Sequence, residues 1–146
     1  MKLSRACTYA FYGLSYIAGQ PRGRFVPASE IHEQYGVPEK HLVKIFQTLV
    51  RAGILTSARG VNGGFSLAKP PSKISALAVI EALEGPINTG CLLLGQPCDH
   101  DVSCHINAVW RKAQHQMLVV LRQSSLADMA PSPNFRPPQL RILERQ

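Results

Sequence analysis

Two helical patterns follow each other so closely in this sequence that only a steep turn can join them. A short helix is predicted over 28–35 and a longer one over 38–52, with only Gly36 and Val37 between them. Apolar residues three and four apart mark the buried side of the longer helix: Leu42, Ile45, Phe46, Leu49 and Val50. A connection this short predicts that the two helices cross at a large angle, as in a helix-turn-helix unit.

A glycine-rich hairpin follows this pair of helices. β-prone residues occupy 54–57 and 65–67, and Asn62-Gly63 in the connection is a strong hairpin-turn signal. Further helices are predicted on either side of the unit, over 4–19 and over 75–85. The order of helix, turn, helix and two-stranded wing predicts a mainly α fold of the winged helix-turn-helix type.

The C-terminal part of the chain has a different pattern. Residues 86–105 combine prolines and glycines with three of the four cysteines, which predicts a long functional loop. A long helix is predicted over 106–123, and its apolar stripe suits pairing with a second copy of the chain. The stripe consists of Ile106, Val109, Trp110, Ala113, Met117, Val120 and Leu121. Residues 131–146 hold four prolines and are predicted to form a loose tail.

The charge balance points to a polyanionic partner. Lys and Arg number 16 against 9 Asp and Glu, a net charge of +7, and residues 1–85 account for +5 of it, with ten basic and five acidic residues. Nucleic acid is favoured over a membrane, because no basic amphipathic stretch stands out and no apolar run is long enough to span a bilayer. The first residues lack an apolar signal core, so we expect a cytoplasmic protein.

The longer helix carries the residues that we expect to read DNA. Its exposed face offers donors, acceptors and cations to base edges and phosphates through Glu39, Lys40, His41, Lys44 and Gln47. Arg51 lies at the far end of the helix, and Arg59 and Asn62 lie in the wing, where an arginine among glycines suits a minor groove or a phosphate. An ordinary solvated helix face is the alternative. A nucleotide-binding loop is not supported, because the wing lacks a Gly-Lys-Ser/Thr ending.

Three cysteines are clustered in the predicted loop. Cys91, Cys98 and Cys104 are separated by six and five residues, which matches neither the Cys-x-x-Cys pairs of zinc ribbons nor the compact run of bacterial ferredoxins. Disulfides are disfavoured in a cytoplasmic chain, so the spacing alone leaves a metal site and free thiols open. Buried structural cysteines usually lie on helices or strands, and these do not.

Two stretches resemble the winged-helix family that includes IscR and NsrR, the Rrf-two family: VPEKHLVKIFQTLVRAGIL over 37–55 and SARGVNGGFSLA over 57–68. The resemblance covers about residues 1–129. It implies a dimeric transcription regulator whose DNA contact surface includes Pro27, Lys40, Val43 and Arg59. Lys40 and Val43 replace the polar residues of an IscR-like reader, so the operator sequence does not transfer.

The resemblance also implies an iron–sulfur cluster, of the 2Fe-2S or 4Fe-4S type, on the three loop cysteines. The fourth ligand of the relatives is missing here. The position of the IscR-like histidine holds Asn107, and the position of the NsrR-like acidic residue on the first helix holds Thr8. We hypothesise that Cys7 of the other subunit completes the site. His105 is the main rival, followed by a water or a small thiol.

These observations predict a transcription regulator that binds an operator in double-stranded DNA as a homodimer. We expect a repressor whose operator affinity is set by a cluster that senses redox state, nitric oxide or iron. The alternative is a regulator of the same fold that senses through thiol oxidation or zinc. No nucleophile–base pair or cofactor motif supports a redox enzyme or electron carrier, and no small-molecule substrate is expected. The predicted division is a DNA-binding domain over 1–85, a cluster-binding loop over 86–105, a dimerisation helix over 106–130 and a flexible tail over 131–146.

Overall fold

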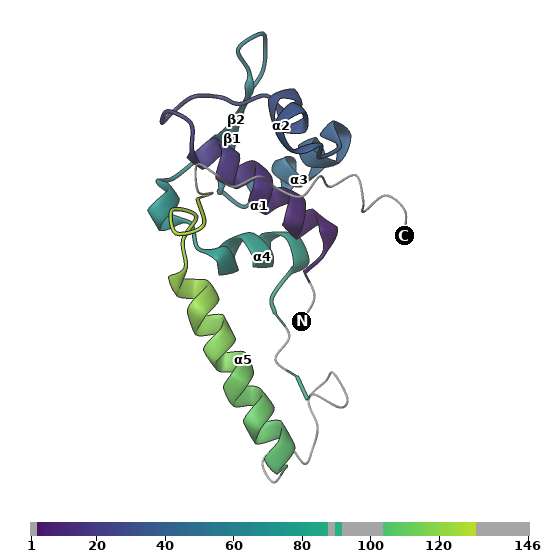
Figure 1. The fold of residues 1–146 in the computed structure, drawn as a ribbon, viewed down its shortest axis with the longest axis vertical. Helices are drawn as coiled ribbons and strands as arrows, with labels where there is room; N and C mark the ends of the chain where they lie inside the picture. The colour runs from purple at the N-terminus through teal and green to yellow at the C-terminus, as the bar shows by residue number, and fades with distance from the viewer. Residues whose placement is uncertain (1–2, 88–89, 92–103, 131–146) are drawn as a thin grey trace.

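The computed structural model describes residues 3–87, 90–91 and 104–130, and its elements are mainly helical (Figure 1). In chain order the elements are α1 (Arg5–Ala18), α2 (Ala28–Tyr35), α3 (Glu39–Arg51), β1 (Leu55–Ala58), β2 (Gly64–Leu67), the short 3-10 helix η1 (Pro71–Lys73), α4 (Ala76–Glu84) and α5 (His105–Gln123). The predicted order of helix, turn, helix and wing is confirmed. The tail over 131–146 and most of the cysteine loop lie outside the described residues.

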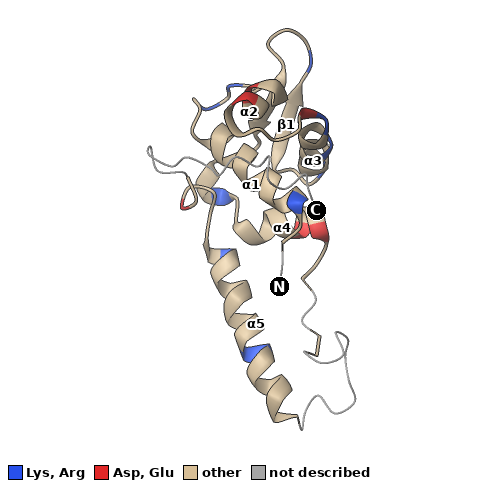
Figure 2. Ribbon diagram, turned by 45° about the vertical axis from the view of Figure 1, so that its right-hand side comes forward, with Lys and Arg blue, Asp and Glu red and all other residues tan. Residues whose placement is uncertain are grey.

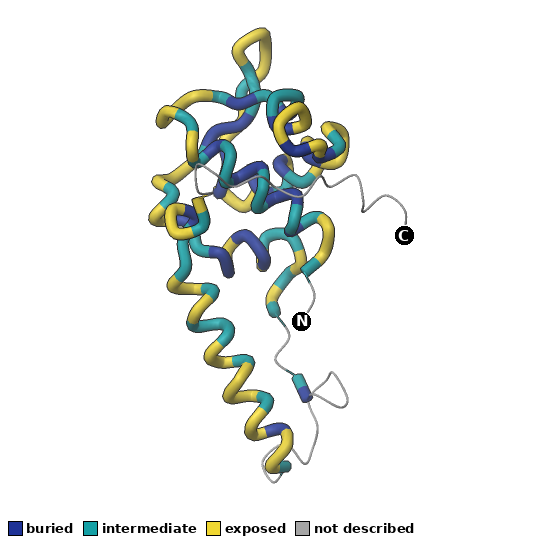
Figure 3. The backbone as a smooth tube through the Cα atoms, in the orientation of Figure 1, coloured by how far each residue is buried: buried dark blue, intermediate teal, exposed yellow. Residues whose placement is uncertain are grey.

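The core lies where α1, α3 and α4 meet, in the upper body of Figure 3. Phe46 of α3 is completely buried, and its ring meets the ring of Phe65 edge-on with the centroids 5.0 Å apart. Ser4 caps α1 as predicted, because its hydroxyl accepts a hydrogen bond from the Cys7 N–H at 3.3 Å. Burial of the apolar side of α3 stabilises the fold, and it leaves the opposite side of that helix on the surface.

The close contact between α1 and α3 depends on Gly13. A Cβ atom at this position would lie 2.5 Å from the ring of Phe46 and 3.3 Å from the side chain of Leu42. We expect Gly13→Ala to lower the free energy of unfolding by about 1–3 kcal/mol, because the enclosed ring has little space into which it can move. Denaturant unfolding measures the loss. Gly19→Ala is the control, since its nearest contact would be an ordinary 3.5 Å, and an equal loss in both variants would contradict this account.

The wing is an antiparallel pair in which Leu55 faces Leu67 and Ala58 faces Gly64. The first strand begins one residue later than predicted and the second begins one residue earlier. Asn62-Gly63 does not form a two-residue turn. Instead the N–H of Gly63 donates to the carbonyl of Gly60 at 3.0 Å. Gly60 has a φ of 100°, a positive value that glycine adopts more readily than other residues.

Helix α5 projects from the core: its N-terminal end lies far from the core, and the helix leads the chain back to it (Figure 1). The helix ends at Gln123, so it occupies most of the segment over 106–130 that we predicted as the dimerisation helix. The N–H of Ala76 then donates to the carbonyl of Ser124 at 2.8 Å, and the N–H of Leu126 donates to the carbonyl of Ile74 at 2.9 Å. Leu126 is completely buried in the core. These contacts fix the C-terminal end of α5 to the segment around the start of α4.

Candidate nucleic-acid interface and cysteine site

The turn between α2 and α3 holds α3 at the surface. Gly36 has a φ of 70°, a left-handed conformation that favours glycine, and Nδ1 of His32 lies 2.8 Å from the carbonyl oxygen of Val37. All the predicted DNA-reading residues of α3 are exposed: Glu39, Lys40, His41, Lys44, Gln47 and Arg51. Arg51 donates to the hydroxyl of Thr48 at 3.1 Å, so its guanidinium lies along the helix.

The wing presents its predicted residues at the far end of the hairpin. Arg59 and Asn62 are exposed, and Val61 between them is fully exposed. At the base of the wing, Val26 and Phe65 each donate a backbone N–H to the carbonyl of the other, both at 2.8 Å. This bridge places Pro27, the half-buried N-cap of α2, next to the wing. Nothing in the sequence pattern indicated the bridge.

A polar cluster holds the loop that leads into α2. The guanidinium of Arg24 donates to both oxygens of Glu30, at 2.9 and 2.7 Å, and the hydroxyl of Tyr16 donates to the same carboxylate at 2.6 Å. These donors lower the pKa of the Glu30 carboxyl group. The cluster therefore connects α1 to the first turn of α2 and supports the position of Pro27.

Basic segments lie along one edge of the molecule (Figure 2). The wing, α3 and the N-terminal end of α1 each contribute a Lys or Arg segment to this edge. Lys40, Lys44 and Arg59 are among the exposed basic side chains that it presents. This edge also carries acidic segments, Glu39 of α3 among them. Basic side chains on a helix and a hairpin are suited to the phosphate backbone on either side of a DNA groove.

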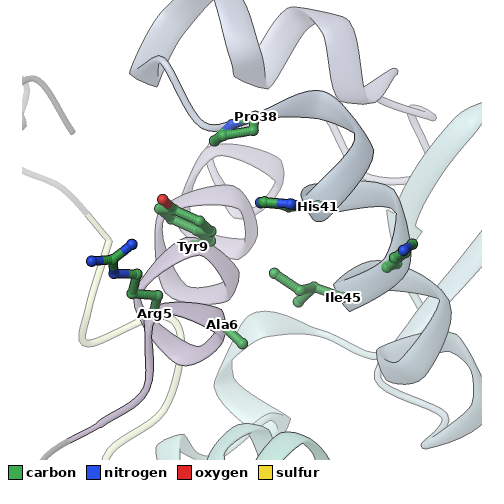
Figure 4. Close-up of a pocket in the computed structure, with 7 residues that line it drawn as sticks. Arg5, Ala6, Tyr9, Pro38, His41 and Ile45 are labelled. Atoms are coloured by element: carbon green, nitrogen blue, oxygen red, sulfur yellow. The ribbon is translucent and has the colours of Figure 1, made fainter. Parts of the chain in front are cut away.

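A cavity of about 370 Å³ lies between the N-terminal turns of α1 and α3 (Figure 4). Its lining combines apolar surface with basic side chains: Arg5, Ala6, Tyr9, Pro38, His41, Lys44 and Ile45. In Figure 4, His41 and Ile45 extend from α3 toward α1, and Arg5 lies at the outer edge. The sequence interpretation did not include Arg5 among the candidate DNA-contact residues. The available signal was a basic residue in the first turn of a helix that has no acidic residue there.

Two of the three loop cysteines lie within the described residues. Cys91 is buried and Cys104, the N-cap of α5, is half-buried, and both are free thiols. Cys98 lies outside the described residues, and within them no three potential metal ligands come together. His105, next to Cys104, is exposed. One turn along, Asn107 is buried, and neither of its amide atoms has a hydrogen-bond partner among the described residues.

Cys7 faces the interior of its own subunit. It is completely buried, and burial together with the neighbouring Glu84 carboxylate raises the pKa of its thiol to about 12. Glu84 also accepts the backbone N–H of Ser4 at 2.8 Å, and its own pKa is lowered by these hydrogen bonds from Ser4 and Cys7. The geometry therefore keeps Cys7 as a protonated thiol that ties α1 to α4.

Comparison with known proteins extends over nearly the whole chain. The family model Rrf2, described as an iron-dependent transcriptional regulator, matches residues 3–132. The structure of CymR, the global cysteine regulator of B. subtilis, matches with a TM-score of 0.74 and 25% identity over 89% of this chain and 96% of CymR. The structure of T. potens IscR matches with a TM-score of 0.67 and 27% identity over 97% of this chain and 96% of IscR. No described helix combines the length and apolarity that crossing a membrane requires.

Proposed function

Because the chain belongs to the Rrf2 family of transcriptional regulators, we propose that it binds an operator in double-stranded DNA as a homodimer and represses transcription there. We also propose that an iron–sulfur cluster sets its affinity for the operator. The observation that carries the proposal is the basic face of α3, which is exposed beside the wing while the apolar face of the same helix is buried. Members of this family are transcription regulators rather than enzymes.

Recognition of DNA is assigned to α3 and the wing. The major groove, about 12 Å wide, admits one α-helix, and Lys40 lies in the first turn of α3, where recognition helices contact base edges. Lys44 lies one turn further on the same exposed face and is assigned to a phosphate. Arg59 and Asn62 of the wing are assigned to the adjacent minor groove or its backbone.

The cavity between α1 and α3 is assigned to a backbone phosphate. Arg5, His41 and Lys44 supply hydrogen-bond donors around it, and the apolar floor reduces the competition from water. The DNA surface therefore extends from the wing across α3 to the first turn of α1.

Dimerisation is assigned to the exposed apolar side of α5. Ile106, Val109 and Val120 are 61%, 72% and 59% exposed, and steps of about 100° place them within about 60° of each other around the helix. A contiguous apolar stripe of this kind indicates a protein–protein contact. A two-fold dimer would present two α3 helices to half-sites about one helical turn, ~34–36 Å, apart.

Cys91, Cys98 and Cys104 are the residues assigned to the cluster, which would supply electron exchange and reactivity toward oxidants and nitric oxide. For the fourth ligand we propose His105 in preference to Cys7. His105 is exposed next to Cys104, whereas Cys7 is completely buried in its own subunit. Sensing through thiol oxidation is the second candidate. It is favoured by the free thiols of Cys91 and Cys104 and by the likeness to a cysteine regulator.

Lys44→Ala and Lys40→Ala are expected to weaken DNA binding in different ways. Loss of a phosphate contact at Lys44 should weaken binding to all sequences and reduce the slope of log affinity against log salt by about 1. Loss of a base contact at Lys40 should cost about 1–3 kcal/mol and relax the preference at one operator position. Genome-wide footprinting identifies the operator, and titrations with operator variants at several salt concentrations measure both effects.

Lys112→Ala is the control for these variants, because Lys112 is an exposed lysine on α5, away from α3. It should leave both the salt dependence and the sequence preference nearly unchanged. If Lys40→Ala and Lys44→Ala behave like this control, α3 is not the recognition helix.

A further inference from the structure

The wing carries an apolar side chain at its tip. Val61 is 103% exposed, more than any other large apolar residue that the structure describes. The others in this exposed group lie on helices: Val43 on α3, and Ile106, Val109 and Val120 on α5. Figure 1 shows the wing and α5 at opposite ends of the described structure, so a dimer formed through α5 leaves Val61 uncovered.

The backbone of the turn fixes the position of Val61. Because the N–H of Gly63 donates to the carbonyl of Gly60 at 3.0 Å, Val61 and Asn62 are the two central residues of a β-turn. Neither has a positive φ, so both adopt ordinary backbone conformations. A side chain at Gly63 would collide with the carbonyl oxygen of Ala58, so the hairpin is tightly closed behind them. The turn therefore holds Val61 at the outermost point of the wing.

Only the tip of such a hairpin fits into the minor groove of DNA. The groove is about 6 Å wide, and two paired strands lie about 4.8 Å apart even before their side chains are counted. Side chains at the corners of the turn therefore reach the floor of the groove while the strands stay outside it. The floor presents only acceptors at an A·T pair, whereas a G·C pair adds an amino donor. Valine has no atom that accepts a hydrogen bond, so an amino group beneath it would be buried without a partner.

We propose that Val61 lies against the floor of the minor groove and selects A·T pairs there. The inference rests on the proposed function, which assigns the wing to a minor groove or its backbone. Arg59 favours the same sequences, because the narrow groove of A·T tracts has an enhanced negative potential that attracts arginine. Asn62 accepts either kind of pair, since its amide is both a donor and an acceptor. Val61 is thus the wing residue that excludes the amino group.

An operator that contains diaminopurine in place of adenine tests this contact. The modified base adds the amino group to the minor groove and leaves the major-groove edge of the pair unchanged. Hydroxyl-radical footprinting of the full-length protein locates the base pairs under the wing, and fluorescence anisotropy compares duplexes modified at those pairs with the unmodified operator. The wild type should bind the modified duplex about 5–150-fold more weakly, the penalty for burying a donor without a partner. Inosine·C pairs at the same positions should be bound more tightly than G·C pairs, because they differ only in that amino group.

Val61→Thr assigns the discrimination to the valine. It keeps the shape of the side chain and supplies a hydroxyl that accepts a hydrogen bond from the amino group, so most of the penalty should disappear. The unfolding temperature should not change, because Val61 is fully exposed. Val43→Thr is the same substitution on α3, which is assigned to the major groove. Whatever its effect on affinity, it should leave the ratio of the two affinities as in the wild type, and Arg59→Ala should keep the penalty as well.

Equal affinity of the wild type for modified and unmodified duplexes, in a protein that binds its operator specifically, would overturn the inference alone. A penalty that survives Val61→Thr, or that Arg59→Ala also removes, would overturn it too, because another part of the wing would then account for the discrimination. Absence of specific binding to any duplex would overturn the proposed function and the inference with it.

Discussion

Val109→Glu combined with Val120→Glu is expected to convert the protein into monomers and to abolish tight operator binding. Both side chains are largely exposed in the single chain, so the substitutions should leave its fold intact. In the proposed dimer they would bury unpaired carboxylates, which is strongly unfavourable. A monomer holds one half-site only, and the loss of the second contact should weaken operator binding by about 10²–10⁴-fold. Sedimentation velocity and fluorescence anisotropy with an operator duplex measure the two effects.

The matched control is Ala108→Glu combined with His115→Glu. These residues are also exposed on α5, but they lie about 100° or more around the helix from the two valines. The control adds the same two glutamates and should remain dimeric. If the valine variant sediments like the wild type, the dimer uses another surface and the assignment of α5 is wrong.

Cys91→Ser combined with Cys104→Ser is expected to remove the bound iron and to leave the protein with the operator affinity of its cluster-free form. Two of the three proposed thiolate ligands disappear, and the remaining one cannot hold a cluster. If cluster binding and operator binding are coupled as strongly as is typical of allosteric proteins, the cluster-loaded wild type and the variant should differ about 5–150-fold in operator affinity. Iron and sulfide assays after anaerobic purification, followed by operator titration, measure both quantities.

Two single variants accompany this experiment. Cys7→Ser should keep its iron, because the Cys7 thiol is buried against Glu84 within its own subunit. His105→Ala should hold iron more weakly and lose it faster in air, as expected for the exposed fourth ligand. If instead Cys7→Ser loses its iron and His105→Ala keeps it, the fourth ligand is Cys7. A wild type without iron whose operator affinity changes with peroxide would establish thiol sensing instead.

Local signals in the sequence determined the secondary structure of this protein. Ser4 accepts the hydrogen bond that begins α1, Ser75 does the same for α4, and Gly36 supplies the left-handed residue after α2. Each of these interactions joins residues no more than a few positions apart, so each could be predicted from residue types and spacing alone. The exposed basic face of α3 is predictable for the same reason, since helical periodicity sorts its residues into a buried and an exposed side.

Only the tertiary structure decided which distant residues meet. The bridge between Val26 and Phe65, the return of Leu126 to the core, and the contact of Cys7 with Glu84 join residues far apart in the chain. The last of these bears on the proposed site, because the cysteine that we proposed for a partner's cluster is completely buried within its own subunit. Such pairings depend on how whole helices pack against each other. The sequence pattern of one segment shows which of its residues are buried, but not which distant residues they contact. Asn107 shows the same limit: its position near Cys104 follows from the sequence, but its burial was decided by the tertiary structure.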